Sequence, residues 1–292
     1  MENKRIIIVD AYGVFNFGQG ISIPVLKEFQ KWIAEGKRVY ILSNTTATNV
    51  NAEKSYAKKG VIKGVDYTDI LTSGQFASED IQAGQLPIKG NRYYVFGTAN
   101  FKSTNPIPSL FEGSSYQCVD SIEEADFIYC GIPQLTDGNG EKYDSVELSD
   151  FAPMVKELAA SGKTLVCANP DKCANEGGRF VVRQGSIAEL YEKLGGKVVY
   201  YGKPDPRIFE ALIARYCPEV PKDTIVMIGD TCTTDILGAH RAGIEAILTI
   251  EGGVTEYLLR KNHMWFADFL ETLPEMARPD EVWTRVSKEP LF

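Results

Sequence analysis

The sequence predicts an α/β protein with a doubly wound, parallel-sheet core and a smaller α/β unit inserted into it. Two features of the chain support this fold class. Short runs of apolar, β-branched residues, typical of strands buried on both faces of a parallel sheet, alternate with longer segments in which apolar residues recur at helical spacing. The alternation breaks once, in the middle of the chain, and then resumes. The length of 292 residues is sufficient for one large or two medium domains.

The first part of the chain begins the core. Residues 5–9 form an apolar run that predicts a buried strand, and residues 39–42 form a second one. Between them, residues 24–35 carry apolar side chains on one helical face. Because strand and helix alternate, we expect parallel pairing with right-handed crossovers. The next predicted elements are a helix over 51–59, a strand over 69–72 and a helix over 77–83.

The middle of the chain predicts the inserted unit. Gly and Pro cluster at residues 84–90, which is typical of a domain boundary. We therefore expect a core made of residues 1–85 and 198–292, and a cap made of residues 86–197. The cap is predicted to hold strands at 93–96, 127–130 and 164–168 and helices near 146–160 and 187–194. The core is predicted to resume with a strand at 198–201, a helix at 206–216 and a strand at 224–228.

The composition narrows the class of protein and its partners. Hydrophobic residues make up 44% and charged residues 24% of the chain, which is typical of a compact globular protein and excludes a disordered or collagenous one. The net charge of −8 makes nucleic acid and anionic membranes poor partners. The sequence contains neither a signal-peptide core nor a run of about 20 apolar residues. We expect a cytoplasmic protein, with a homodimer as a candidate assembly.

The cysteines predict no disulfide framework and no zinc site. There are six of them, and no pair has the Cys-x-x-Cys spacing. Cys130 and Cys167 lie inside apolar, strand-like runs, where a free thiol behaves as a small hydrophobic side chain. We therefore expect reduced thiols, with the most apolar of them in the core.

Polar residues stand where the predicted strands end. Asp10, Ser43 with Asn44, Lys203 and Asp230 each follow an apolar run. In an open α/β sheet the site forms at the carboxyl ends of the strands. Carboxylates from different strands suit Mg²⁺, which prefers oxygen ligands. A lysine, a hydroxyl and helix N-terminal amides could hold a phosphate beside it.

Taken singly, these residues are also typical of caps and turns. An Asp at a strand end is often a turn former or a helix N-cap, and Asp205 before Pro206 is expected to be one. The segment Asn169-Pro170-Asp171 is likewise typical of a turn. It is the ordered set of strand-terminal residues that indicates a phosphoryl-transfer site.

Four ordered segments of the chain resemble a known family. Asp10–Val14, Ile41–Asn44, Gly202–Pro204 and Ile228–Asp235 look like the four motifs of the haloacid dehalogenase superfamily. The insertion that contains Ala168–Asp171 resembles the α/β cap of its sugar-phosphatase-like subfamily, which includes phosphoglycolate and nucleotide-monophosphate phosphatases. The resemblance covers nearly the whole chain and implies a Rossmann-like catalytic core.

The resemblance implies roles for the matched residues. Asp10 would be the nucleophile that forms an aspartyl-phosphate, and Ser43 would hydrogen-bond the phosphoryl group. Lys203 would orient and partly neutralise both Asp10 and the phosphate. Mg²⁺ would be bound by Asp10, by the main-chain carbonyl of residue 12 and by Asp230. Asp235 would bind the ion through water or hold its ligands in place. The expected substrate is a small phosphorylated metabolite.

Three polar residues are candidates for contact with the substrate. Asn44 follows the predicted phosphate-binding serine directly. Asn169 and Asp171 lie in the predicted cap and could approach the substrate from there.

Position 12 departs from the family pattern. Phosphatases of the family usually have a second Asp there as general acid, whereas this chain has Tyr12. We expect a phosphatase whose turnover is slow or depends on the leaving group. The first alternative is a haloacid-dehalogenase type of reaction, because Asp-x-Tyr-Gly resembles the first motif of enzymes in which the Asp attacks carbon. The second is a phosphate- or metabolite-binding protein with little turnover.

Overall fold

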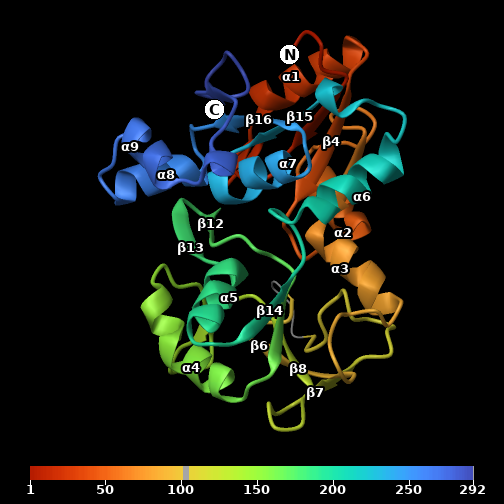
Figure 1. The fold of residues 1–292 in the computed structure, drawn as a ribbon. Helices are drawn as coiled ribbons and strands as arrows, with labels where there is room; N and C mark the ends of the chain where they lie inside the picture. Colours follow the sequence, from red (N-terminus) through yellow and green to blue (C-terminus); the bar gives the residue numbers. More distant parts are fainter. Residues whose placement is uncertain (101–104, 292) are drawn as a thin grey trace. The chain divides into compact units, whose positions relative to one another are not determined.

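The computed structural model describes residues 1–100 and 105–291 of the chain. The chain divides into two compact units (Figure 1). The first unit consists of Met1–Ser43, Asn49–Thr72 and Lys203–Phe292, and the second consists of Asn44–Thr48 and Ser73–Gly202.

A parallel sheet forms the centre of the first unit. Its strand order is β17-β16-β15-β1-β4-β5, and every neighbouring pair runs parallel. Strand β1 (Ile6–Val9), one of the two central strands, is fully buried, as its continuous apolar sequence predicts. The strands are β1 (Ile6–Val9), β4 (Arg38–Ser43), β5 (Asp69–Thr72), β15 (Ile225–Gly229), β16 (Glu245–Thr249) and β17 (Glu281–Trp283). The predicted α/β fold class is confirmed.

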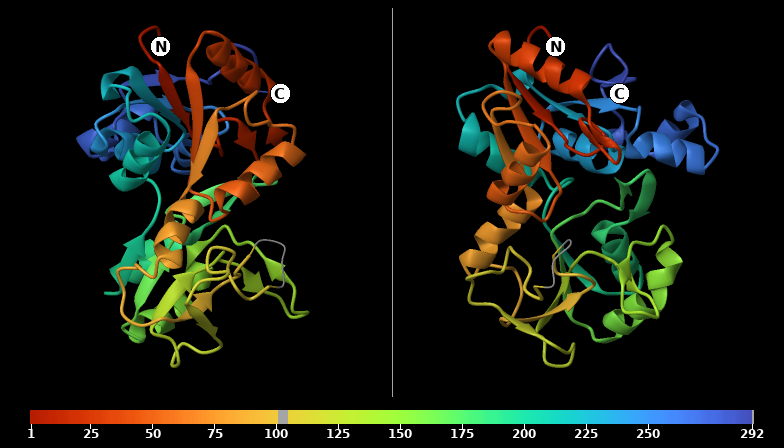
Figure 2. Two further views of the ribbon diagram at one scale, coloured as in Figure 1. Left: turned by 90° about the vertical axis from the view of Figure 1, so that its right-hand side faces the viewer. Right: turned by 180° about the vertical axis from the view of Figure 1, so that it is seen from behind.

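Helices cover both faces of this sheet. Figure 2 shows α1 (Ile23–Ala34, red-orange) on one face and α6 (Pro206–Tyr216, teal) on the other. Helix α1 buries Val25, Leu26 and Phe29, the stripe that its helical spacing predicts. The other helices of this unit are α2 (Asn49–Lys58), α7 (Leu237–Arg241), α8 (Val254–Lys261) and α9 (Phe266–Thr272), and a short hairpin joins β2 (Asn16–Phe17) to β3 (Gly20–Ile21).

The second unit has a parallel sheet of its own. Its strand order is β14-β11-β8-β6-β7, with all neighbours parallel. The strands are β6 (Arg92–Phe96), β7 (Gln117–Val119), β8 (Phe127–Cys130), β11 (Thr164–Cys167) and β14 (Lys197–Tyr200). The helices are α3 (Ser73–Gln82), α4 (Ala152–Ala160) and α5 (Gln184–Lys193), and two hairpins pair β9 (Leu135–Thr136) with β10 (Lys142–Tyr143) and β12 (Cys173–Glu176) with β13 (Arg179–Val182).

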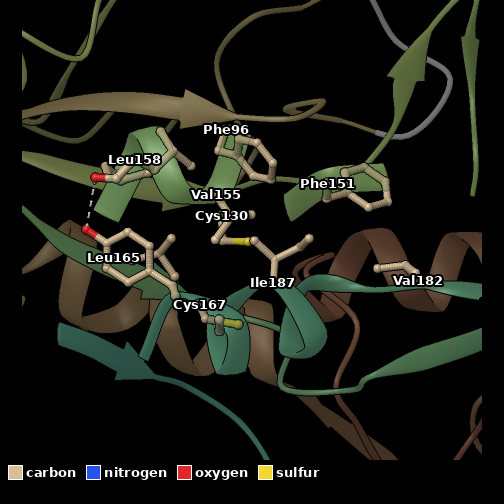
Figure 3. Packing of buried hydrophobic residues seen from close by; sticks show 12 residues of the cluster. Phe96, Cys130, Phe151, Val155, Leu158, Leu165, Cys167, Val182 and Ile187 are labelled. Atoms are coloured by element: carbon tan, nitrogen blue, oxygen red, sulfur yellow. Dashed lines mark hydrogen bonds between the residues drawn. The ribbon is translucent and has the colours of Figure 1, made fainter. Parts of the chain in front are cut away.

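Helices α4 and α5 pack on one face of the second sheet. Val155 and Ile187 from these helices meet Cys130 and Cys167 from the strands in a fully buried apolar cluster (Figure 3). All six cysteines are free, in agreement with the predicted reduced thiols. The two core cysteines act here as small apolar side chains.

The boundaries between the units differ from those expected at 85/86 and 197/198. Helix α3 packs in the second unit, where Ala77 and Ile81 join the apolar cluster around Tyr93. Strand β14 is an edge strand of the second sheet, in register with β11 from Thr164↔Lys197 onward. An amphipathic helix or an apolar strand is compatible with either neighbouring sheet. The contacts that assign it form only in the tertiary structure.

Among the residues that the structure describes, no helix is long and apolar enough to cross a membrane.

The second unit should depend on its buried cluster for stability. We expect Ile187→Ala, at a fully buried position on α5, to lower the free energy of unfolding by about 2–5 kcal/mol, because it leaves a cavity among well-packed side chains. Met154→Ala on α4 is the control, since Met154 is exposed and its loss should change stability by about 0.5 kcal/mol or less. Urea denaturation followed by circular dichroism measures both. Equal effects would contradict the packing described here.

Candidate active site

The first unit brings five of the predicted residues to one edge of its sheet. Asp10 follows β1 directly, and its backbone N–H continues the ladder by donating to Ile228 O at 2.9 Å. Ser43 is the last residue of β4, and Asp230 follows β15. Because the strands are parallel and adjacent, their carboxyl ends meet at the same edge. All three side chains are buried.

Lys203 lies at the centre of this edge with its ammonium group fully buried. Its Nζ donates to Asp10 Oδ1 at 2.6 Å and to Leu42 O at 2.8 Å, and lies 2.7 Å from Asp235 Oδ1. The contacts with Asp10 and Leu42 are hydrogen bonds, whereas the contact with Asp235 is an ion pair without hydrogen-bond geometry. The three contacts fix both the position of Lys203 and the orientation of the Asp10 carboxylate.

Asp10, Asp230 and Asp235 form a cluster of buried carboxylates. Each offers an oxygen, and the three oxygens lie within 4.8 Å of one another. Lys203 brings one positive charge to three carboxylates, so a divalent cation would balance the rest. Clustered carboxylate oxygens are also the donors that Mg²⁺ prefers. The chemistry of this cluster therefore fits the predicted ion.

Backbone amides hold two of these carboxylates in place. Asp235 Oδ2 accepts from the N–H groups of Asp230 and Thr231 at 3.1 and 3.0 Å. Asp230 Oδ2 accepts from Val254 N at 2.6 Å, and its Oδ1 accepts from the Thr231 hydroxyl at 2.9 Å. Such bonds restrict each carboxylate to one orientation before any ligand arrives.

Gly13 is required by the close approach of Asp230. Its φ of +79° lies in the left-handed region, and a Cβ at this position would overlap Asp230 Oδ2. The glycine that follows position 12 in the first motif thus makes room for a residue of the fourth motif.

Ser43 and Tyr12 lie beside a tyrosine that the sequence analysis did not identify. Tyr56 on α2 is buried, its side chain hydrogen-bonds to Ser43, and it interacts electrostatically with Tyr12 and Asp10. Burial raises the pKa of Tyr56 well above its ordinary value, and Tyr12 and Asp10 raise this pKa further, whereas the hydrogen bond with Ser43 lowers it. Tyr12 itself is 38% exposed. The available signal was the position of Tyr56 on the buried face of the helix that follows the second motif.

The three predicted substrate residues belong to the second unit and contact one another. Asn44 Nδ2 donates to Asp171 Oδ1 at 2.8 Å. Asp171 N donates to Asn169 Oδ1 at 3.0 Å, the bond of an Asx turn. The Asn169 carbonyl in turn accepts from the Cys167 thiol. These bonds give all three residues a structural role, and their contact with a substrate stays a prediction.

Comparisons with known proteins match this chain to hydrolases. A family model described as HAD-hydrolase-like matches residues 200–276. Ribonucleotide monophosphatase NagD of Escherichia coli K12 is 24% identical over 249 residues, which are 84% of this chain and 87% of that protein. Both comparisons include residues of the candidate site.

Solved structures share the fold. A haloacid dehalogenase-like hydrolase from Brucella suis 1330 matches with a TM-score of 0.77 and 23% identity, over 97% of this chain and 96% of that one. A 4-nitrophenylphosphatase from Thermotoga maritima matches with a TM-score of 0.63 and 21% identity, over 98% and 95%. A glycerol phosphate phosphatase from Mycobacterium tuberculosis, crystallised with magnesium, matches with a TM-score of 0.64 and 20% identity, over 97% of this chain and 75% of that one.

The carboxylate cluster predicts stabilisation by Mg²⁺. At 100 times its Kd, the ion should raise the free energy of unfolding by about 2.7 kcal/mol, because it binds only the folded cluster. Asp230→Asn should remove this increment, since it replaces a carboxylate of the cluster by a neutral amide. Thermal unfolding at increasing Mg²⁺ concentrations measures the effect.

The control for this experiment is Asp66→Asn. Asp66 is also a buried carboxylate of the first unit, but it lies outside the cluster and accepts from Gln30 Nε2 and Ile62 N. The control variant should lose some stability yet keep the full Mg²⁺ increment. Loss of the increment in both variants would show that the ion does not act through the cluster.

Proposed function

Because the chain belongs to the haloacid dehalogenase superfamily of hydrolases with an inserted cap unit, we propose that it is a Mg²⁺-dependent phosphatase. Its substrate would be a small phosphate monoester, cleaved through an aspartyl-phosphate at Asp10. The observation that carries the proposal is the contact of Lys203 Nζ with both Asp10 and Asp235. This contact supports the proposal because it brings a buried cation next to Asp10, the proposed nucleophile, and next to the carboxylates that are proposed to bind the metal.

Asp10 has the environment that a nucleophilic carboxylate requires. Its Oδ1 is held by Lys203 at 2.6 Å, so the side chain does not need to reorient before it attacks. The carboxylate would form a bond to phosphorus while the ester oxygen leaves with the bonding electron pair. Water would then hydrolyse the aspartyl-phosphate and release phosphate.

The remaining residues of the first unit would bind and stabilise the phosphoryl group. Lys203 and the Ser43 hydroxyl supply hydrogen-bond donors to its oxygens. Asp10, Asp230, Asp235 and the backbone carbonyl of Tyr12 are the proposed groups that hold Mg²⁺. When bound, the ion would offset the repulsion between the anionic nucleophile and the anionic phosphoryl group. In this proposal Asn44, Asn169 and Asp171 contact the substrate.

In this proposal Tyr12 determines how well the leaving oxygen is protonated. A phenol with an ordinary pKa near ~10 is a weaker acid than a carboxylic acid, so it protonates an alkoxide poorly. Loss of a positioned general acid typically costs roughly 10²–10⁴ in rate. Esters whose leaving group is stable as an anion would be the better substrates. The relatedness to a protein named 4-nitrophenylphosphatase is compatible with this preference.

Two further functions are kept as alternatives because of Tyr12. The pattern Asp10-x-Tyr12-Gly13 is also that of dehalogenases, in which Asp attacks carbon and halide leaves without a proton. Against this alternative, the carboxylates of Asp230 and Asp235 would form a metal site that such a reaction does not need. A binding protein with little turnover is the other alternative.

A cytoplasmic location and a homodimer stay predictions from the sequence.

A substrate panel tests the proposal directly. Phosphate esters and halogenated acids are incubated with and without Mg²⁺, and phosphate and halide release are measured. We expect Mg²⁺-dependent phosphate release that Asp10→Asn reduces by at least about 10³-fold, because it removes the nucleophile. Asp66→Asn is the control that keeps its activity. Halide release would favour the dehalogenase, and phosphate binding without release of either product would favour the binding protein.

Substitutions at position 12 test the leaving-group argument. Tyr12→Asp restores a carboxyl group and should raise kcat/KM for glycerol phosphate more than for 4-nitrophenyl phosphate, because only the alkoxide needs a proton. Tyr12→Asn is the matched control, similar in size to Asp but unable to donate an acidic proton. Equal gains for both esters, or equal effects of Asp and Asn, would show that another group protonates the leaving oxygen.

A further inference from the structure

Asn16 closes the loop that follows Asp10. Its backbone N–H donates to Ala11 O at 2.9 Å, and its backbone carbonyl accepts from Gly13 N at 3.1 Å. Tyr12 lies between these two bonds in the sequence. The Tyr12 carbonyl and the Gly13 N–H belong to one trans peptide group, in which they point in opposite directions. The bond from Gly13 to Asn16 therefore also fixes the direction of the Tyr12 carbonyl.

A lysine at the end of α2 holds the side chain of Asn16. Lys59 directly follows this helix, and its Nζ donates to Asn16 Oδ1 at 3.3 Å. An ammonium group can only donate, so it faces the oxygen of the amide and sets the orientation of the amide. Asn16 is 1% exposed, and its Nδ2 has no hydrogen-bond partner among the residues that the structure describes. Within residues 1–100 and 105–291, the bond from Lys59 is thus the one side-chain hydrogen bond of Asn16.

The loop after Asp10 also contacts the carboxylate cluster and the middle of α2. Gly13 lies so close to Asp230 that a Cβ at this position would overlap Asp230 Oδ2. Phe15, from the same loop, packs edge-to-face against Tyr56 of α2, with the ring centroids 5.6 Å apart. The loop thus connects α2 with the candidate metal site.

We propose that Lys59 is a positioning residue that anchors the Asn16 amide and thereby orients the Tyr12 carbonyl for Mg²⁺. This inference rests on the proposed function, because it takes that carbonyl to be one of the groups that hold the ion. Without the ammonium group, both ends of the buried amide would lack a partner, and burial of an unpaired polar group is costly. The amide would then turn toward solvent, and the backbone bonds of Asn16 that fix the Tyr12 carbonyl would loosen.

The experiment measures the Kd of Mg²⁺ by calorimetry in the absence of substrate. We expect Lys59→Met to raise this Kd by roughly three- to tenfold, because it removes a charged hydrogen-bond donor from a buried amide. The direction of the change is diagnostic, since loss of a positive charge by itself would strengthen the binding of a cation. Lys59→Arg keeps a charged donor and should bind Mg²⁺ more tightly than Lys59→Met. In steady-state assays Lys59→Met should need more Mg²⁺ for half-maximal activity, yet reach the wild-type kcat at saturation.

Lys58→Met is the matched control. Lys58 lies in the last turn of α2 and is exposed, as Lys59 is, so both variants should fold. The control loses the same charge from the same end of the helix but leaves the bond to Asn16 in place. Its Kd for Mg²⁺ should equal the wild-type value or fall slightly below it. In the background of Asn16→Ala, Lys59→Met should raise the Kd no further, because Lys59 acts only through Asn16.

The outcomes separate this inference from the proposed function. A Kd in Lys59→Met at or below the wild-type value, an equal rise in Lys58→Met, or a further rise in the double variant overturns the role of Lys59 while phosphatase activity stands. If Asn16→Ala does not fold, the comparison of the two lysine variants still decides. Absence of phosphate release from every ester overturns the proposed phosphatase, whereas weaker Mg²⁺ binding in Lys59→Met alone still supports Lys59. A wild-type protein that binds no Mg²⁺ overturns both.

Discussion

The buried ammonium group of Lys203 is the interaction on which the candidate site depends. It contacts Asp10, Asp235 and the carbonyl of Leu42, which come from three separate parts of the chain. Three carboxylates so close together would repel one another in a medium of low polarity. The positive charge of Lys203, which forms ion pairs with two of them, lowers this repulsion. It also orients the carboxylate that is proposed to react.

Backbone groups also hold the carboxylates of the cluster in place. N–H groups after β15 hold the Asp235 carboxylate, and the amide that begins α8 holds Asp230. Gly13 leaves space for Asp230 because it has no side chain and accepts a positive φ. The negative charge of the cluster is therefore held in a fixed arrangement. Such preorganisation suits a cation and a transferring phosphoryl group, since little reorganisation is needed when they bind.

The surroundings of Asp10 carry two phenols. Tyr12 is partly exposed, whereas Tyr56 is buried and bonded to Ser43. The two phenol groups therefore differ in their exposure to solvent. Burial raises the pKa of Tyr56 and so favours its protonated form. Tyr12 stands two residues after Asp10, at the position where phosphatases of the resembling family usually have a second Asp.

The sequence by itself determined the fold class and the polar residues at the strand ends. Continuous apolar runs require burial on both faces, and parallel strands must end at a common edge, so Asp10, Ser43 and Asp230 could be placed together without coordinates. The tertiary structure decided the rest. Helix α3 and strand β14 joined the second unit through contacts with Tyr93 and β11, because their patterns fit either sheet. Tyr56 could not be assigned from the sequence, since its bond to Ser43 depends on the packing of α2 rather than on any local motif.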